Sequence, residues 1–189
     1  MRNVWHEFRP MKVRVFIACS LDGFIAGPND ELDWLEGPDG AEDTFTPFFK
    51  GIGAMLMGRR TYDVVSSFEG DWPYGDTPVI VATNRPLHMA KPLVQGYQGT
   101  IEELVAKAKT MSEGGDVYLD GGDLIRQALD SALVDDITLT LIPIVLGTEY
   151  LSSVGPNRCI GLNSVANTPS AVAWWNWYTN RPRLAPSAS

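Results

Sequence analysis

Three short turns in this chain carry residue types that can bind phosphate groups. Each turn follows a run of mainly apolar residues. Backbone N–H groups at the start of a helix attract anions, glycine lets the backbone approach them closely, and a guanidinium can bind a phosphate through two parallel hydrogen bonds. The three turns are Gly58-Arg59-Arg60-Thr61, Thr83-Asn84-Arg85 and Gly121-Gly122-Asp123.

Taken separately, each turn also has an ordinary structural interpretation. Gly58 and the Gly121-Gly122 pair can simply form tight turns. Arg59, Arg60 and Arg85 can be solvated surface charges. In a parallel α/β sheet, however, such turns all lie at the carboxyl ends of the strands and can face one crevice. Together they predict a site for a dinucleotide with an additional phosphate, and NADPH is the candidate cofactor.

An alternating series of strands and helices is needed to position these turns. Runs rich in β-branched residues predict strands, and apolar residues spaced three or four apart predict helices. The alternation predicts one α/β domain with a largely parallel sheet and helices on both faces. The expected strands cover 13–18, 54–57, 79–83, 116–119 and 137–142, with a possible short one at 93–97; the expected helices cover 59–68, 101–111 and 124–133, and one more follows Asp43-Thr44.

Two of these helices carry further signals. Thr100 and Glu103 have the types and spacing of a capping box at the start of the helix over 101–111. In the helix that begins at Arg59, Tyr62 and Val65 form the expected buried stripe, which Phe68 can extend.

Composition and charge exclude several classes of function. The 189 residues carry a formal net charge of −8, which disfavours general binding to nucleic acids or anionic membranes. No apolar run approaches the length of a membrane span. Cys19 and Cys159 match no disulfide framework or zinc spacing, so we expect a cytoplasmic protein without a metal site. Neither a Rossmann fingerprint nor a Walker lysine motif is present.

Five motifs occur in the order and spacing of one known family. They are Ser20-Leu21-Asp22-Gly23-Phe24-Ile25-Ala26, Met57-Gly58-Arg59-Arg60-Thr61-Tyr62, Val117-Tyr118-Leu119-Asp120-Gly121-Gly122, Leu133-Val134-Asp135-Asp136 and Ile142-Pro143-Ile144-Val145-Leu146-Gly147. Over residues 11–150 the chain resembles the dihydrofolate reductase-like family. Within it, the chain is most similar to the reductase domain of bifunctional riboflavin-biosynthesis deaminase-reductases and its stand-alone relatives.

This resemblance implies a fold, a cofactor and a set of binding residues. The fold would be a dihydrofolate reductase-like domain over residues 11–180 with a mostly parallel mixed sheet of about eight strands. It would be preceded by an extension at 1–10 and followed by a frayed tail at 181–189. NADPH would be the hydride donor, and a homodimer is expected. The implied cofactor-binding residues are Ala18, Gly58, Arg59, Arg60, Thr61, Thr83, Asn84, Arg85, Gly121, Gly122 and Asp123, and the loop at 22–27 would cover the nicotinamide.

The proton donor stays open among three carboxylates. Folate-reducing members of the family place an acid on the helix before the glycine-arginine turn, where Glu42 and Asp43 fall in this chain. Asp43 can equally cap that helix. Asp22 is a further candidate, because its loop would lie near the nicotinamide, although it can also be a turn residue before Gly23. A carboxylate that donates a proton near neutral pH needs burial to raise its pKa.

We therefore expect an NADPH-dependent reductase that transfers hydride to a C=N or C=O carbon of a small heterocyclic or sugar-linked substrate. The resemblance suggests a 5-amino-6-(5-phosphoribosylamino)uracil or a pterin as the type of substrate. The alternative is a relative that binds NADPH but has lost turnover. Two features motivate this alternative: the acid is not assigned, and the sequence after Gly147 departs from the pattern of the family.

Overall fold

The computed structural model describes residues 9–27, 30–35, 43–68, 70–88, 93–142 and 144–146. The chain divides into two compact units that interleave along the sequence. The described parts of unit 1 are 9–15, 51–68, 74–88 and 93–137, and those of unit 2 are 16–27, 30–35, 43–50, 70–73, 138–142 and 144–146. All three predicted phosphate-binding turns belong to unit 1. The predictions for Glu42, Cys159 and the tail at 181–189 lie outside the described residues.

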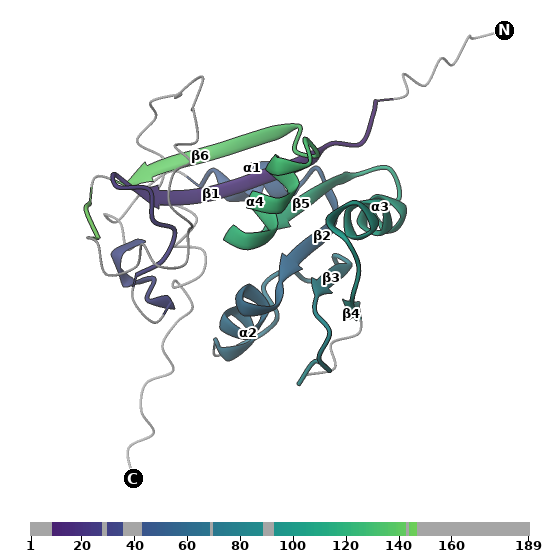
Figure 1. Ribbon diagram of the computed structural model, residues 1–189, viewed down its shortest axis with the longest axis horizontal. Coiled ribbons are helices and arrows are strands. Elements are labelled where there is room, and N and C mark those ends of the chain that lie inside the picture. Colours follow the sequence, from purple (N-terminus) through teal and green to yellow (C-terminus); the bar gives the residue numbers. More distant parts are fainter. Residues whose placement is uncertain are drawn as a thin grey trace, which may run out of the picture. The chain divides into compact units, whose positions relative to one another are not determined.

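Six strands form one sheet in the described part of the chain, in the order β4-β3-β2-β5-β1-β6 (Figure 1). They are β1 (Val13–Ser20), β2 (Ile52–Gly58), β3 (Val79–Ala82), β4 (Val94–Tyr97), β5 (Asp116–Asp120) and β6 (Asp136–Ile142). The α-helices are α1 (Phe45–Phe49), α2 (Arg59–Ser67), α3 (Ile101–Met111) and α4 (Gly122–Asp130), and a short 3-10 helix, η2, covers Asp33–Leu35.

The pairings within unit 1 are parallel, as the sequence predicted. β2 pairs with both β3 and β5, and β3 also pairs with β4. Parallel neighbours are joined by right-handed crossovers. The α2 crossover, from β2 to β3, moves along the sheet in the opposite direction to the α3 crossover, from β4 to β5. The two helices therefore lie on opposite faces of the sheet, which confirms the predicted arrangement.

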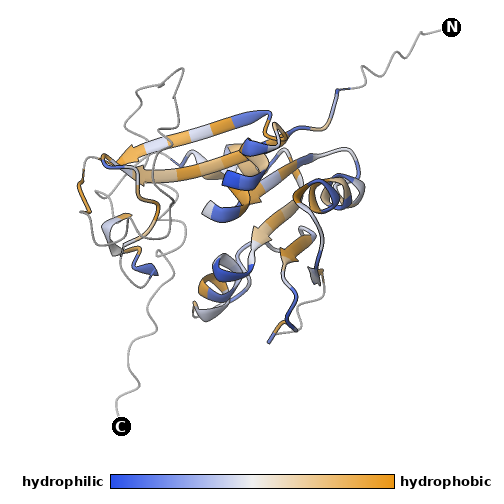
Figure 2. Ribbon diagram, in the orientation of Figure 1, coloured by the Kyte–Doolittle hydropathy of each residue, from blue (hydrophilic) through white to orange (hydrophobic). Residues whose placement is uncertain are grey.

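The central strands of unit 1 are buried on both faces, which explains their nearly continuous apolar sequences. Residues 54–57 of β2, 79–81 of β3 and 117–119 of β5 all have 0% exposure. Figure 2 shows these strands in hydrophobic colours, whereas β6 alternates between hydrophobic and hydrophilic residues. The buried strands form a rigid base, so the residues that follow their carboxyl ends are held in fixed positions.

The helices of unit 1 confirm most of the local predictions. Thr100 Oγ1 accepts from the Glu103 N–H at 3.3 Å, and Glu103 Oε2 accepts from the Thr100 N–H at 2.9 Å, which completes the capping box of α3. In α2, Tyr62 and Val65 are buried. Phe68 is 37% exposed because the helix ends before it, so the extension of the buried stripe to Phe68 was wrong.

Residue Arg9 of the predicted N-terminal extension takes part in unit 1. Its guanidinium forms an ion pair with Asp116 at 2.5 Å, and the Lys12 N–H donates to the same carboxylate at 3.0 Å. The Asp116 side chain is only 3% exposed, so these contacts supply partners for a buried charge.

Unit 2 has its own aromatic cluster. The Phe16 ring lies 5.5 Å from the Phe45 ring and 4.9 Å from the Phe48 ring, measured between centroids. Phe45 and Phe48 are the buried residues of α1, as their spacing predicted. The cluster fixes this short helix against the second half of β1.

Candidate functional site

The glycine turns after β2 and β5 meet at the carboxyl ends of these two strands. Met57 and Asp120 are register partners, so Gly58 and Gly121 follow side by side. A Cβ added to Gly121 would lie 2.8 Å from Thr61 Oγ1 and 3.3 Å from the Gly58 backbone nitrogen. Gly121 also has φ +106°, a conformation that side-chain-bearing residues rarely adopt. Glycine is thus required at position 121 by both contact and conformation.

This contact brings the starts of α2 and α4 together, and neither start is closed by a side-chain cap. The N-cap residues are Gly58 and Gly121, and neither has a side-chain capping hydrogen bond within the described residues. By contrast, α3 is closed by its capping box. Two adjacent helix starts without side-chain caps, together named the cradle, have the N–H groups and the positive dipole ends that suit an anion.

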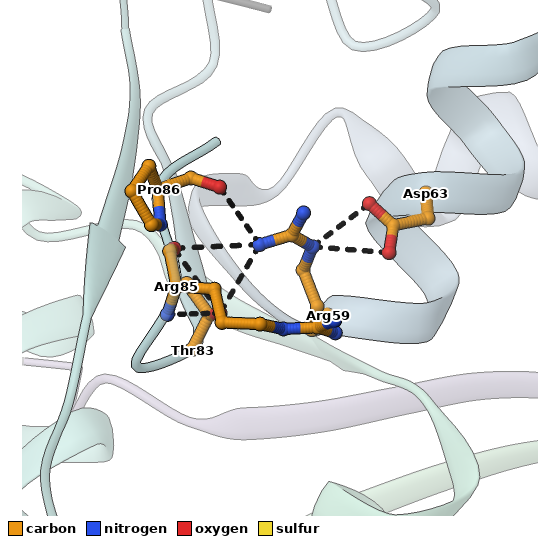
Figure 3. Close-up of polar contacts among 5 residues, drawn as sticks. All are labelled: Arg59, Asp63, Thr83, Arg85 and Pro86. Atoms are coloured by element: carbon orange, nitrogen blue, oxygen red, sulfur yellow. Dashed lines mark hydrogen bonds and ion pairs between the residues drawn. The ribbon is translucent and has the colours of Figure 1, made fainter. Parts of the chain in front are cut away.

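Arg59 joins the start of α2 to the turn after β3 (Figure 3). Its Nε donates to both carboxylate oxygens of Asp63, at 2.8 and 3.0 Å. Its Nη1 lies 3.3 Å from Thr83 Oγ1 and donates to the carbonyl oxygens of Arg85 at 3.3 Å and Pro86 at 3.0 Å. The Arg59 side chain is 9% exposed. The predicted first and second turns are therefore in direct contact.

The remaining basic and polar residues of these turns face solvent. Arg60, Asn84 and Arg85 are exposed. In Figure 3 all the marked contacts of Arg85 involve its backbone, and its guanidinium has no hydrogen bond or ion pair with any residue that the structure describes. Thr61 is half-buried, with its hydroxyl directed at Gly121.

The other predicted cofactor residues differ in what they contribute. Gly122 begins α4 and adds its backbone to the cradle. The Asp123 carboxylate accepts from Arg126 at 2.6 Å and from Gln127 at 2.9 Å, so it is directed along its own helix. Ala18 is half-buried in the part of β1 that belongs to unit 2.

The carboxylates singled out from the sequence have structural partners. Asp43 Oδ1 accepts from the Thr46 N–H at 2.9 Å, which agrees with the capping alternative. Asp22 is exposed, and its Oδ1 accepts from the Ser20 hydroxyl at 2.6 Å and from the Leu146 N–H at 3.2 Å. These contacts tie the loop after β1 to residues 144–146 within unit 2. Both carboxylates are exposed.

Asp120 is the titratable residue that the sequence analysis missed. It ends β5 beside the two glycine turns, and burial raises its pKa to about 6. Hydrogen bonds from the Gly121 N–H and the Tyr118 side chain oppose this rise in pKa only in part. A charged residue directly after an apolar run resembles an ordinary strand end. The one signal that could have identified Asp120 was its place immediately before a glycine pair.

The site combines two uncapped helix starts, which suit a phosphorylated ligand, with a carboxyl whose pKa burial raises to about 6. The Gly58–Gly121 contact supports the fit of a dinucleotide, because a side chain at position 121 would fill the approach to both helix starts. Among the described residues, no group of three or more His, Cys, Asp or Glu side chains could hold a metal ion. No helix in the described ranges is long and apolar enough to span a membrane.

Known proteins are similar to this chain in sequence and in fold. The RibD C-terminal domain profile matches residues 11–164. A protein assigned to riboflavin biosynthesis from Shewanella sp. PV-4 is 34% identical, with a TM-score of 0.63 over 72% of this chain and 79% of that one. RibD from Acinetobacter baumannii, 20% identical, shares the fold with a TM-score of 0.51 over 73% of this chain and 47% of its own. Uncharacterized protein YwjB of Bacillus subtilis (strain 168) is 29% identical over 139 residues, which cover 72% of this chain and 79% of YwjB.

Proposed function

Because this chain belongs to the RibD C-terminal domain family, we propose that it is an NADPH-dependent reductase acting on a small heterocyclic or sugar-linked substrate. The observation that carries the proposal is the Gly58–Gly121 contact, where two uncapped helix starts lie together. Its geometry suits a pyrophosphate, which needs several N–H donors and a close backbone approach.

The turns around this cradle have distinct roles in the proposal. The backbone of Gly58 and Gly122 receives the pyrophosphate, Gly121 leaves room for its close approach, and the Thr61 hydroxyl adds a donor. The turn at 83–85 receives the adenosine end, where an arginine is available for an additional phosphate. Bound NADPH would supply the hydride for a C=N or C=O carbon. The substrate class that we favour is a ribosylaminopyrimidine, with a pterin as the second option.

Asp120 is the residue that we propose as the proton source. A reduced C=N or C=O group needs a proton after it accepts hydride, and a carboxyl that remains protonated near pH 6 can deliver it. Asp120 lies at the carboxyl end of β5, directly before the pyrophosphate-binding glycines. Asp43 and Asp22 lack this combination, because one caps α1 and the other is exposed in its loop.

The experiment separates cofactor binding from turnover. Titration with NADPH, followed by the loss of reduced-nicotinamide absorbance with ribosylaminopyrimidine and pterin substrates, should show binding and then oxidation of the cofactor. Absence of NADPH binding refutes the proposal. Binding without turnover across the panel favours the relative that has lost catalysis.

The Asp120→Asn variant tests the role of the acid. We expect it to bind NADPH nearly as well as the original protein but to lose about 100-fold or more in kcat, a typical contribution of a general acid. The kcat of the original protein should fall as the pH rises through about 6, where Asp120 loses its proton. A variant with unchanged kcat and pH profile would exclude Asp120 as the donor.

A further inference from the structure

Tyr118 is a buried tyrosine that lies two residues before the proposed acid on β5. Successive side chains of a strand point to opposite faces of the sheet, so Tyr118 and Asp120 share one face. Tyr118 has 0% exposure, whereas Asp120 is half-buried at the end of the strand. Because solvent does not reach Tyr118, a substrate cannot contact it either. Any effect of Tyr118 on the reaction must therefore pass through its neighbours.

The neighbours of this pair on β2 are apolar. Met55 is the register partner of Tyr118, and Met57 is the register partner of Asp120. Both methionines have 0% exposure. A thioether can accept a hydrogen bond only weakly and cannot donate one. These two side chains therefore cannot stabilise a negative charge on Asp120.

Two hydrogen bonds do stabilise such a charge. The Asp120 carboxyl accepts one from the Gly121 N–H and one from the Tyr118 side chain. Both oppose the rise that burial causes in the pKa of Asp120. The Gly121 donor belongs to the backbone of the turn, whereas the hydroxyl belongs to a side chain that can be replaced without changing the backbone.

Charged side chains on the surrounding elements have other partners. Arg14 of β1, Arg59 of α2 and Asp123 of α4 each form ion pairs with other residues. Arg60 of α2 is exposed. Burial and the two hydrogen bonds are the causes of the shift in the pKa of Asp120. Of these, the Tyr118 hydroxyl is the one that a single conservative substitution removes.

We propose that Tyr118 is a positioning residue for the proton transfer, because its hydroxyl holds the Asp120 carboxyl and stabilises the carboxylate that remains after the proton has left. The proposal rests on the proposed function and deepens it by naming the group that supports the acid.

The proposed step moves one proton. The O–H bond of the Asp120 carboxyl breaks, its electron pair stays on the carboxylate, and the proton goes to the nitrogen or oxygen of the group that has accepted hydride. The Tyr118 hydroxyl keeps its own proton throughout. A hydrogen bond to a charged acceptor is stronger than one to a neutral acceptor, so the contact strengthens as Asp120 ionises.

The Tyr118→Phe variant tests this role through the pKa of Asp120. An NMR titration of the aspartate carboxyl carbons measures this pKa without substrate or cofactor, and Asp120→Asn identifies the signal. Loss of a hydrogen bond to a charged group should lower the acid dissociation constant of Asp120 about tenfold. The pH at which kcat falls should move upward by the same factor in proton concentration, and the Kd for NADPH should change less than about twofold.

Tyr74→Phe is the matched control. Tyr74 also belongs to unit 1 and is 2% exposed, so its replacement removes a similarly buried hydroxyl. It should change neither the pKa of Asp120 nor the pH profile of kcat. If Tyr118→Phe does not fold, replacement of the tyrosines by 3-fluorotyrosine provides a second measurement. Its hydroxyl is a stronger donor, and the pKa of Asp120 should then fall.

The outcomes separate this inference from the proposed function. An unchanged pKa of Asp120 in Tyr118→Phe would overturn the inference whatever the activity. A higher pKa with a pH profile of kcat that stays in place would also overturn it, because Asp120 would not be the proton donor. Failure of the original protein to bind NADPH would refute the proposed function and the role of Tyr118 together, even where the pKa moves as expected.

Discussion

Replacement of Gly121 by alanine should both destabilise the protein and abolish cofactor binding. The φ of +106° costs a side-chain-bearing residue about 1–3 kcal/mol. The new Cβ would also lie 2.8 Å from Thr61 Oγ1, and relieving such an overpacked contact costs about 1–3 kcal/mol more. Against these losses, alanine gains about 0.4–1 kcal/mol by restricting the unfolded chain. We expect Gly121→Ala to lower the free energy of unfolding by about 2–5 kcal/mol.

Gly114→Ala is the matched control for the conformational part of this loss. Gly114 has φ +95°, and a Cβ there would meet nothing within 4 Å. Its replacement should cost only the strain of the backbone, so the difference between the two variants measures the contact at Gly121. Urea unfolding with a common m-value gives both free energies. A double variant, Thr61→Ala with Gly121→Ala, should recover about 0.5–1 kcal/mol of coupling energy.

A Gly121→Ala variant that is no less stable than Gly114→Ala would contradict this prediction. In that case the starts of α2 and α4 are not in close contact and do not form a joint site for the cofactor. Cofactor binding adds an independent measurement. Gly114→Ala should bind NADPH like the original protein, whereas Gly121→Ala should show no saturable binding at temperatures where it remains folded.

Three further predictions concern stability and pH. Gly58→Asp should leave the free energy of unfolding unchanged or higher by a few tenths of a kcal/mol, because it can cap α2, yet it should abolish NADPH binding; retained binding would contradict the cradle. Thr100→Ala should lower the free energy of unfolding by about 1 kcal/mol through loss of the α3 cap, with thermal unfolding as the assay. Asp120→Asn should raise the free energy of unfolding by up to about 3 kcal/mol above pH 6, and this gain in stability should vanish below pH 3.8. Denaturant unfolding of both proteins between pH 3.8 and pH 6 measures this gain, and a gain that is larger at the acidic end would contradict the prediction.

The sign of the Asp120 effect follows from proton linkage. Burial raises the pKa of this carboxyl from 3.8 to about 6, so the folded state binds more protons than the unfolded state between these values. Stability therefore falls as the pH rises through this window. An asparagine at position 120 does not titrate, so the variant does not lose stability as the pH rises through this window.

Much of the fold was predictable because local signals and burial agree. The central strands are short apolar runs, of which β2 ends at Gly58 and β5 is followed by Gly121, and the start of α3 has a complete capping box at Thr100 and Glu103. The meeting of Gly58 and Gly121 was also predictable, since parallel strands bring their carboxyl ends together. The expectation of about eight strands compares with six in the described residues.

The roles of individual charges could not be predicted, because they depend on partners far along the chain. Arg59 is directed at carbonyl oxygens 26 and 27 residues away, and no local pattern distinguishes it from Arg60. Asp120 gains its raised pKa from the atoms packed around it, which the order of residues does not reveal. Asp43 shows the opposite case, because its cap of α1 is a local contact and was foreseen as an alternative.

The two glycines also show how packing and ligand binding can be separated in this fold. Gly121 is required by its φ and by the contact with Thr61, so its presence alone does not indicate a ligand. Gly58 is different: its φ of −69° and ψ of 153° suit any residue, and a Cβ there would meet only Thr61 Oγ1, at 3.9 Å. A serine or aspartate at position 58 would fit and would cap α2. Gly58 therefore leaves the first N–H donors of α2 without a side-chain cap, although a capping side chain would fit. This favours the binding of an anion at the start of α2.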